Sequence, residues 1–204
     1  MRTGTARWVG VGLTAVGVAA LSLNAWRGLA DGTDSGTLLV ALVLLVLILG
    51  GVALAMRSGI RRGRGRHELL AAELPGWTLH EGWADASLQA QLTRVGRWER
   101  GLRSGTRLTV GWSSTGFAVW SGPRGAVREL VAEQWSGIAS VTLGTGLAAS
   151  TPRPALVAET VAGATVVVVP CGRPGGGLLP ASREVVVDLV AQVRAARDAA
   201  GAQL

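Results

Sequence analysis

Residues 37–56 read TLLVALVLLVLILGGVALAM, and this stretch contains no charged side chain. Between residues 38 and 49, eleven of the twelve residues are Leu, Val or Ile. At about 1.5 Å per residue, a helix of this length extends about 30 Å, which is the thickness of the hydrocarbon core of a bilayer. Transfer of these side chains into lipid favours insertion by about 5 kcal/mol. The stretch therefore predicts a transmembrane helix rather than the buried helix of a soluble domain.

A weaker apolar segment precedes it and is bounded by Trp8 and Trp26. The two tryptophans are 18 residues apart. This is about 27 Å along a helix, so the two indoles can lie at opposite interfaces of a membrane. Arg7 and Arg27 lie just outside them. We therefore predict a first transmembrane helix over residues 8–26, which forms a two-helix hairpin with the helix at 37–56.

A cleaved signal peptide is the alternative for the first segment, because Arg2 and Arg7 precede it and residues 20–22, ALS, resemble a cleavage site. After cleavage, Trp26 and Arg27 would no longer lie at the end of a membrane helix. We therefore prefer an uncleaved helix.

The arginines predict the orientation of the chain. Two of them precede the first helix, and five follow the second within ten residues. Because basic residues flank membrane helices on the cytoplasmic side, we expect a multi-pass cell-membrane protein with both termini in the cytoplasm. The five arginines can also contact anionic lipid head groups, at about 1 kcal/mol each. The expected membrane-interface residues are Trp8, Trp26, Arg57, Arg61, Arg62, Arg64 and Arg66.

Composition agrees with this interpretation. The 204 residues are 49% hydrophobic and 16% charged, with a net charge of +7. Basic residues beside a membrane segment are explained by the orientation of the chain in the membrane and by contact with anionic lipid. We therefore expect the lipid bilayer, and not nucleic acid, as the partner of this charge. The single cysteine, Cys171, allows no intrachain disulfide, which agrees with a cytoplasmic domain.

Behind the membrane segments, residues 58–67 are interpreted as an arginine-rich juxtamembrane linker and residues 68–204 as one cytoplasmic domain. Residues 86–100 predict a helix. Arginine recurs at every third position from 94 to 103, which forms either a solvated face or a face that lies on the membrane surface.

From residue 107 onward, apolar and polar residues alternate as they do in β-strands, and turn residues separate the alternating segments. Residues 166–169 are all Val and are expected to form a buried strand. A final helix is expected over residues 182–199. The fold class is therefore expected to be α+β, with a transmembrane hairpin followed by an antiparallel sheet or barrel and a C-terminal helix. The expected strands are 107–112, 117–121, 126–132, 134–143, 155–160 and 164–170.

Two short segments carry a resemblance to a known family. Residues 116–120, GFAVW, are similar to a hairpin of bacterial pleckstrin-homology-like (PH-like) domains, and residues 135–141, WSGIASV, are similar to their W-x-x-I-x-x-V stretch. The resemblance covers about residues 106–199 and implies a bent antiparallel sheet plugged at one end by the C-terminal helix. With two helices ahead of it, the chain resembles uncharacterised actinobacterial membrane proteins. The first hairpin loop lacks the basic cluster of phosphoinositide-binding PH domains, so the resemblance does not imply that ligand.

No set of catalytic, cofactor-binding or metal-ligating residues is recognisable. His67, His80 and Cys171 do not form a zinc or cysteine-protease pattern. Residues 144–149, GTGLAA, match a dinucleotide-binding fingerprint only in their letters, because the prolines that follow prevent the helix that receives the pyrophosphate. We expect a hairpin loop there. The spacing of the strand carboxylates Glu129, Glu133 and Glu159 indicates no acid–base pair.

These observations favour a non-catalytic binding or scaffold domain that contacts a protein or the lipid surface, without a cofactor. The first alternative is an envelope regulator or subunit that acts through its transmembrane helix pair. The second is an unrecognised hydrolase.

Overall fold

The computed structural model describes residues 35–94, 102–148, 150–177 and 179–202. The chain divides into two units, Met1–Ser58 and Gly59–Leu204. Helix α2 (Ser35–Glu73) begins in the first unit and ends in the second. The expected helix at 8–26, with Trp8 and Trp26, lies outside the described residues.

In the first unit, the described part of α2 presents its large apolar side chains outward. Among the residues that the structure describes, α2 is the one helix that is long and apolar enough to cross a membrane, judged by length and composition. The exposed side chains are Val40, Leu42, Val43, Leu44, Val46, Leu47, Leu49, Val52 and Leu54.

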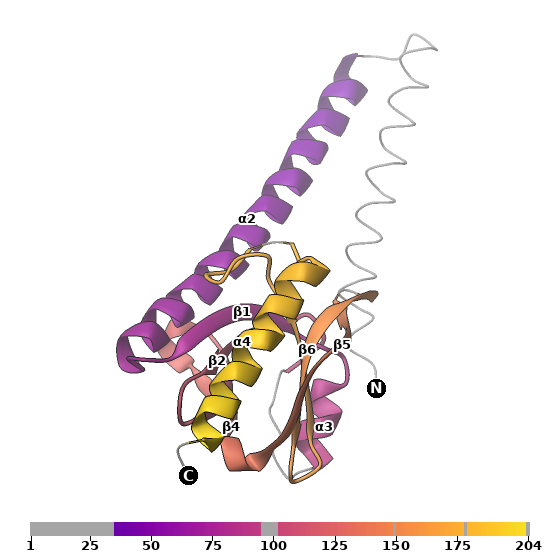
Figure 1. The fold of residues 1–204 in the computed structure, drawn as a ribbon. Helices are drawn as coiled ribbons and strands as arrows, with labels where there is room; N and C mark the ends of the chain where they lie inside the picture. The colour runs from indigo at the N-terminus through magenta and orange to yellow at the C-terminus, as the bar shows by residue number, and fades with distance from the viewer. Residues whose placement is uncertain (1–34, 95–101, 149, 178, 203–204) are drawn as a thin grey trace. The chain divides into compact units, whose positions relative to one another are not determined.

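The second unit is built on a curled, seven-stranded antiparallel sheet in the order β4-β3-β2-β1-β7-β6-β5 (Figure 1). Strands adjacent in sequence pair antiparallel within β1–β4 and within β5–β7, and β1 joins the two groups by pairing with β7. The strands are β1 (Thr78–Ala84), β2 (Arg107–Trp112), β3 (Gly116–Ser121), β4 (Arg128–Gln134), β5 (Ile138–Ala148), β6 (Thr151–Thr160) and β7 (Thr165–Pro170).

Helices and short turns complete this unit, which is α+β as expected. The C-terminal helix α4 (Arg183–Gly201) begins and ends close to the expected positions, with Ser182 at its N-cap. The other elements are α3 (Leu88–Arg94), η1 (Arg124–Ala126) and η2 (Trp135–Gly137).

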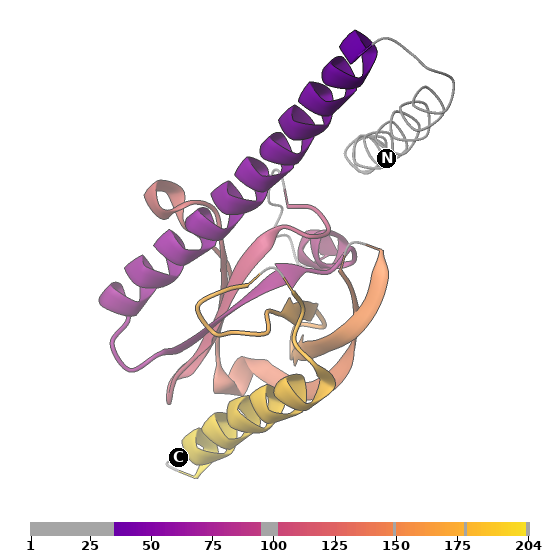
Figure 2. The same ribbon diagram turned by 90° about the horizontal axis from the view of Figure 1, so that it is seen from above.

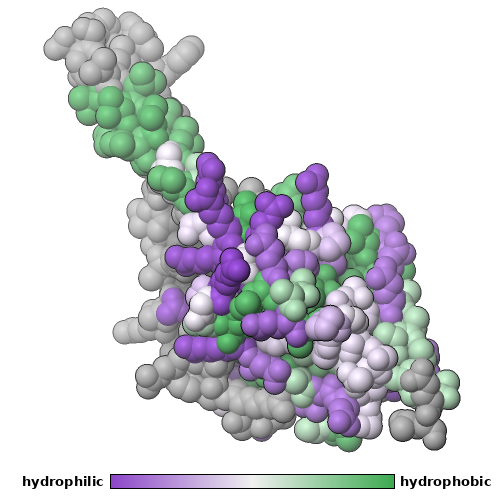
Figure 3. Space-filling view, turned by 90° about the vertical axis from the view of Figure 1, so that its left-hand side faces the viewer, coloured by the Kyte–Doolittle hydropathy of each residue, from purple (hydrophilic) through white to green (hydrophobic). Residues whose placement is uncertain are grey.

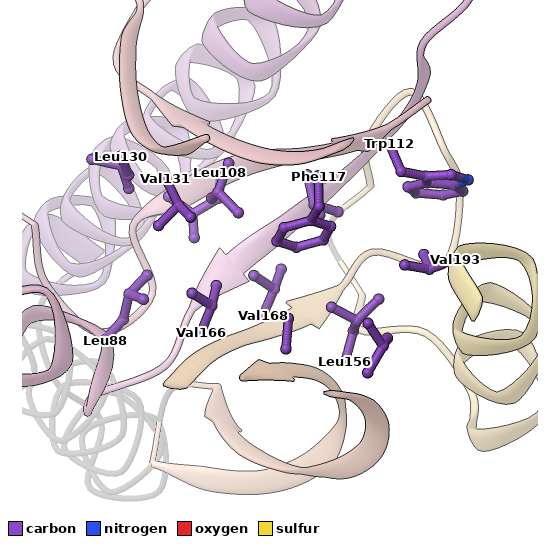
Figure 4. Close-up of a cluster of buried hydrophobic side chains, with 14 of the residues drawn as sticks. Leu88, Leu108, Trp112, Phe117, Leu130, Val131, Leu156, Val166, Val168 and Val193 are labelled. Atoms are coloured by element: carbon purple, nitrogen blue, oxygen red, sulfur yellow. The ribbon is translucent and has the colours of Figure 1, made fainter. Parts of the chain in front are cut away.

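The main hydrophobic core fills the concave side of the sheet. Figure 4 shows Leu108 and Phe117, from β2 and β3, meeting Leu156 and Val168, from β6 and β7. Helix α4 closes this core with one apolar face, because its buried residues recur at three- and four-residue spacing. These residues are Val186, Leu189, Val190 and Val193.

A smaller apolar cluster lies on the other side of the sheet, under the last turns of α2. Leu70 packs there with Leu79, Ala118 and Trp120. Trp77 meets Trp120 edge to face, with ring centroids 5.5 Å apart. Figure 2 shows the last turns of α2 and the helix α4 on opposite sides of the sheet. The end of α2 is therefore part of the folded unit.

Several boundaries differ from the sequence-based expectation. The expected linker 58–67 is helical and continues α2, and the folded unit begins at Gly59 rather than at residue 68. Strand β1 was not expected, because it contains His, Glu and Gly and follows a Pro-Gly turn. In the helix expected over 86–100, α3 ends at Arg94, and residues 95–101 lie outside the described part of the chain.

The loop expected at 144–149 was also wrong, since β5 continues to Ala148 and pairs there with β6. The glycines that indicated a loop allow a close approach between strands instead. A Cβ at Gly146 would lie 2.9 Å from a methyl carbon of Val169 and 3.0 Å from one of Val167. The buried strand expected at 166–169 is confirmed, because all four valines are at most 8% exposed.

Candidate functional site

The most extensive buried polar cluster of the second unit lies where α2 meets the sheet. Gly63, Arg66 and Leu70 are spaced by three and four residues, so they share one face of the helix, and all three are buried. A Cβ at Gly63 would lie 2.9 Å from Oε2 of Glu81 on β1. The absence of a side chain at Gly63 therefore lets the helix backbone approach a carboxylate of the sheet.

The guanidinium of Arg66 joins the helix to the sheet. Its Nη2 donates to Glu81 Oε2 at 2.8 Å and its Nε donates to Thr109 Oγ1 at 2.6 Å. Its Nη1 donates to the backbone carbonyls of Arg107 at 3.2 Å and Gly122 at 2.8 Å. All three nitrogens of the side chain are thus hydrogen-bonded, to β1, to β2 and to the turn after β3.

The carboxylate of Glu81 is equally enclosed. Glu81 and Thr109 lie opposite each other on β1 and β2. The Thr109 hydroxyl donates to Oε1 of Glu81, while Oε2 accepts from Arg66. Because Glu81 is fully buried and Arg66 only 2% exposed, this is a salt bridge without contact with water.

Burial and the attraction between Arg66 and Glu81 shift the pKa of each residue in opposite directions. Burial raises the pKa of Glu81, whereas Arg66 and the Thr109 hydroxyl lower it. Burial also lowers the pKa of Arg66, against the attraction of Glu81. In both residues burial is the larger effect, so each charge depends on the other to remain in the interior.

A second arginine, Arg107, lies beside this pair at the start of β2. Its Nη2 donates to the carbonyl of Gly177, and its Nη1 lies 3.8 Å from Sγ of Cys171. The central guanidinium carbon lies 5.1 Å from the centre of the Trp83 ring, a cation–π geometry. Arg107 therefore holds the loop between β7 and α4 against the sheet.

Cys171 is enclosed by the same loop. Its backbone N–H donates to the carbonyl of Glu81 at 2.8 Å, and the Glu81 N–H donates to the carbonyl of Pro174 at 2.9 Å. Burial raises the pKa of the Cys171 thiol to about 11, so the thiol is protonated at neutral pH. A protonated, inaccessible thiol is a weak nucleophile.

The polar groups of this cluster connect helix α2 to the sheet. Both carboxylate oxygens of Glu81 and all three nitrogens of Arg66 bond to protein atoms. Over the described ranges of the chain, no group of three His, Cys, Asp or Glu residues could hold a metal ion. The arrangement can fix α2 on the sheet, and its polar groups are already occupied.

The expected membrane-interface residues separate into two groups. Arg57, Arg61, Arg62 and Arg64 are exposed on α2, and Arg64 Nε lies 3.8 Å from Glu68 Oε1. The expectation for Arg66 was wrong, because this side chain is directed into the sheet, where the buried carboxylate of Glu81 neutralises it.

The other candidate residues do not gather into one site. Glu129 and Glu133 lie on β4, and Glu159 lies on β6, where its Oε2 accepts from the Ser140 hydroxyl at 3.0 Å. His80 is buried on β1, with its Nδ1 2.9 Å from the carbonyl of Glu81.

Sequence reasoning did not identify Glu81, Thr109 or Arg107. One signal was present, because residues 79, 81 and 83 are Leu, Glu and Trp and share one face of a strand. An acidic residue between two large apolar ones indicates a buried carboxylate that needs a cationic partner.

Comparison of the chain with protein families, with curated proteins and with solved structures gives no match.

Proposed function

We propose that the chain is an integral membrane protein whose second unit is a non-catalytic binding or scaffold module at the membrane. The observation that carries this proposal is the row of exposed Leu and Val side chains on α2 between residues 40 and 54. A helix that is apolar on all sides needs an apolar surrounding, and lipid provides it without any protein partner.

The finer fold proposed for the second unit is PH-like. Its support is the order of the elements, in which a curled antiparallel sheet of hairpins is followed by one C-terminal helix whose apolar face lies on the core. A fold of this type offers loops and sheet edges as binding surfaces. We propose that such a surface contacts a protein or the lipid head groups.

The buried polar cluster supports a non-catalytic role. Catalysis needs a reactive group that a substrate can reach. Arg66 and Glu81 are enclosed and paired, and the Cys171 thiol is buried with a raised pKa. Their chemistry fits the maintenance of the fold.

We also propose that both termini are cytoplasmic, with a two-helix hairpin in the membrane. The support is the distribution of arginine along the chain, with Arg2 and Arg7 at the start and Arg57, Arg61, Arg62 and Arg64 after the span.

Fractionation and cysteine labelling of intact cells test these proposals together. The chain should remain in the membrane pellet after an alkaline carbonate wash. A membrane-impermeant maleimide should label Ser35→Cys from outside and should label Ser104→Cys, at an exposed turn position, only after lysis. The wild type, whose Cys171 is buried, provides the background. Release by carbonate would overturn the membrane anchor, and outside labelling of Ser104→Cys would overturn the orientation.

Exchange of the apolar span tests which part of the chain binds partners. Residues 37–56 are replaced by an unrelated apolar helix of equal length, and proteins cross-linked to the full chain in cells are compared before and after the exchange. Partners that remain support a binding module in the second unit. Partners that disappear contradict it and favour action through the helices.

A further inference from the structure

An arginine from a distant loop lies on the exposed side of α2. Three side-chain carbons of Arg124, in η1 after β3, lie 3.5 to 4.0 Å from the position of a Cβ at Gly65. The aliphatic part of Arg124 therefore lies over the helix backbone, where the glycine leaves room for it. Its guanidinium is brought to the arginine-rich part of α2.

Helix geometry places two further arginines beside this contact. Arg61 and Arg62 precede Gly65 by four and three residues, so they are its neighbours on the helix surface. Arg61, Arg62 and Arg124 are all exposed. Two positive charges of α2 and one from the turn after β3 thus surround Gly65; we call these three residues the basic surface.

The charges of the basic surface are not neutralised within the described parts of the chain. None of its three arginine side chains has a hydrogen bond or an ion pair there, whereas the side chain of Arg64 is close to Glu68 and that of Arg66 is bonded to Glu81. Figure 3 shows long hydrophilic side chains projecting from this side of the second unit. Like charges on one surface repel each other, and an anion that binds among them relieves the repulsion.

We propose that the basic surface formed by Arg61, Arg62 and Arg124 binds the phosphate groups of anionic lipids in the membrane that anchors the chain. This inference rests on the membrane anchor proposed above, and it names anionic lipid as the binding partner of the second unit. Planar guanidinium groups suit phosphate oxygens because they donate two parallel hydrogen bonds.

The position of the arginines along α2 favours lipid as the source of the phosphate. Arg61 and Arg62 follow Met56, the last residue of the apolar stretch, by five and six residues of the same helix. At 1.5 Å per residue this is about 8 to 9 Å, at the outer edge of a head-group region about 5 to 8 Å deep, and the long arginine side chains can reach back to it. Helical side chains also tilt toward the N-terminus, which is the direction of the apolar stretch.

A lipid titration of the full chain tests the proposal. The detergent-solubilised protein is titrated with short-chain phosphatidylglycerol, with phosphatidylcholine of the same chain length and with inorganic phosphate. We expect binding of phosphatidylglycerol only. Arg124→Met, which keeps the packing on Gly65 but removes the charge, should weaken this binding about fivefold. Arg124→Lys should restore most of it, and Arg61→Gln with Arg62→Gln should weaken it further.

Arg153→Gln is the matched control, because Arg153 is an exposed arginine on β6 and its loss changes the net charge equally. It should leave the affinity unchanged. If Arg153→Gln weakened the binding of phosphatidylglycerol as much as Arg124→Met does, the loss of affinity would be an effect of net charge alone. Unchanged binding by Arg124→Met would assign the lipid contact to α2 alone. Binding of inorganic phosphate that depends on Arg124 would make this a site for a free ion. Each of these three results overturns the proposal.

Membrane retention is measured by a carbonate wash of the membranes from which the protein is solubilised. Loss of carbonate-resistant retention in the wild type would overturn the anchor, whatever the lipid titration gives. Retention without a preference for phosphatidylglycerol would leave the anchor in place and overturn only the basic surface.

Discussion

At the scale of single residues, Arg66 and Glu81 are the most consequential pair in the second unit. Both charges are removed from water, and each is stabilised by the other at 2.8 Å. The desolvation of two ions costs about as much as their attraction returns, so the pair adds little net stability over an apolar contact. The loss of one partner is different, because it leaves the other charge buried and unpaired.

We therefore predict that Arg66→Met lowers the free energy of unfolding of the second unit by about 3 to 5 kcal/mol. The measurement is chemical unfolding of the detergent-solubilised chain, followed by tryptophan fluorescence. Arg64→Met is the control. Its weak, exposed contact with Glu68 contributes about 0 to 1 kcal/mol.

The variant should also show a characteristic pH dependence. Without Arg66, burial raises the pKa of Glu81 further above its unfolded value. A group with a raised pKa in the folded state contributes stability at low pH and loses it as the pH rises. Arg66→Met should thus regain stability toward pH 5, and Glu81→Gln added to it should give the same recovery at pH 7. A deficit independent of pH would show that lost packing is the cause.

Cys171 gives a second prediction at this scale. Its pKa is raised to about 11 by burial, so its contribution to stability is present below the unfolded pKa of about 9 and is lost as the pH rises through 11. The chain has no Tyr and no Lys, which makes this pH range unusually free of other titrating side chains. Arg107 and Glu81 face the thiol; Arg107 lowers the pKa of Cys171 and Glu81 raises it, both by less than burial does.

We predict that the wild type loses about 2 to 3 kcal/mol of unfolding free energy between pH 8 and pH 11 more than Cys171→Ala does. Unfolding curves of both proteins at four pH values provide the test. If the two proteins lose stability in parallel, ionisation of Cys171 is not the cause.

At the scale of elements, α2 changes its surroundings along its length. Its first part exposes apolar side chains, and its last fifteen residues belong to the folded unit, where Gly63, Arg66 and Leu70 contact the sheet. A glycine normally weakens a helix interior by about 0.5 to 1 kcal/mol. At Gly63 this cost is offset by the close approach that the Arg66–Glu81 bond requires.

Two glycines of α2 make a matched pair for testing this role. A Cβ at Gly63 would lie 2.9 Å from Glu81 Oε2, whereas a Cβ at Gly59 would meet nothing within 4 Å. We predict that Gly63→Ala destabilises the second unit by about 1 to 3 kcal/mol, because the paired carboxylate has no room to move. Gly59→Ala should stabilise it by about 0.4 to 1 kcal/mol. Thermal unfolding of both variants measures the difference, and equal effects would exclude a close contact at Gly63.

At the scale of the whole molecule, the boundary of the folded unit has a direct experimental consequence. A fragment that begins at residue 68, the domain boundary expected from the sequence, lacks both Arg66 and Gly63. In this fragment Glu81 is buried without its partner. A fragment that begins at Gly59 keeps them.

We predict that the fragment 59–204 is soluble and unfolds cooperatively, whereas 68–204 unfolds at a markedly lower denaturant concentration or aggregates. Urea unfolding of the two fragments decides this. Similar midpoints would mean that the end of α2 is dispensable for the fold.

Features that depend on neighbouring residues could be predicted from the sequence. The helical period in α4, the run of four valines in β7 and the alternation in β2 and β3 are local patterns, because each indicates the type of one element. Which faces are buried is not always indicated, since β2 and β3 are buried on both faces. The apolar stretch at 37–56 is of the same kind, and its helical state follows from length and composition. Its location in a membrane stays a prediction.

Features that depend on distant residues were decided by the tertiary structure. Arg66 pairs with Glu81 fifteen residues away and with Thr109 forty-three residues away, and nothing in the local sequence distinguishes it from its exposed neighbours Arg62 and Arg64. The strand at Gly144–Ala148 and the contact of Arg124 with Gly65 depend likewise on which strands and turns come together. The sequence by itself determined α4, β2, β3, β7 and the apolar span, because these follow from local hydrophobicity and conformational preference. The tertiary structure alone decided which arginine neutralises a buried acid and which remain exposed, because burial and pairing exist only once the chain has folded.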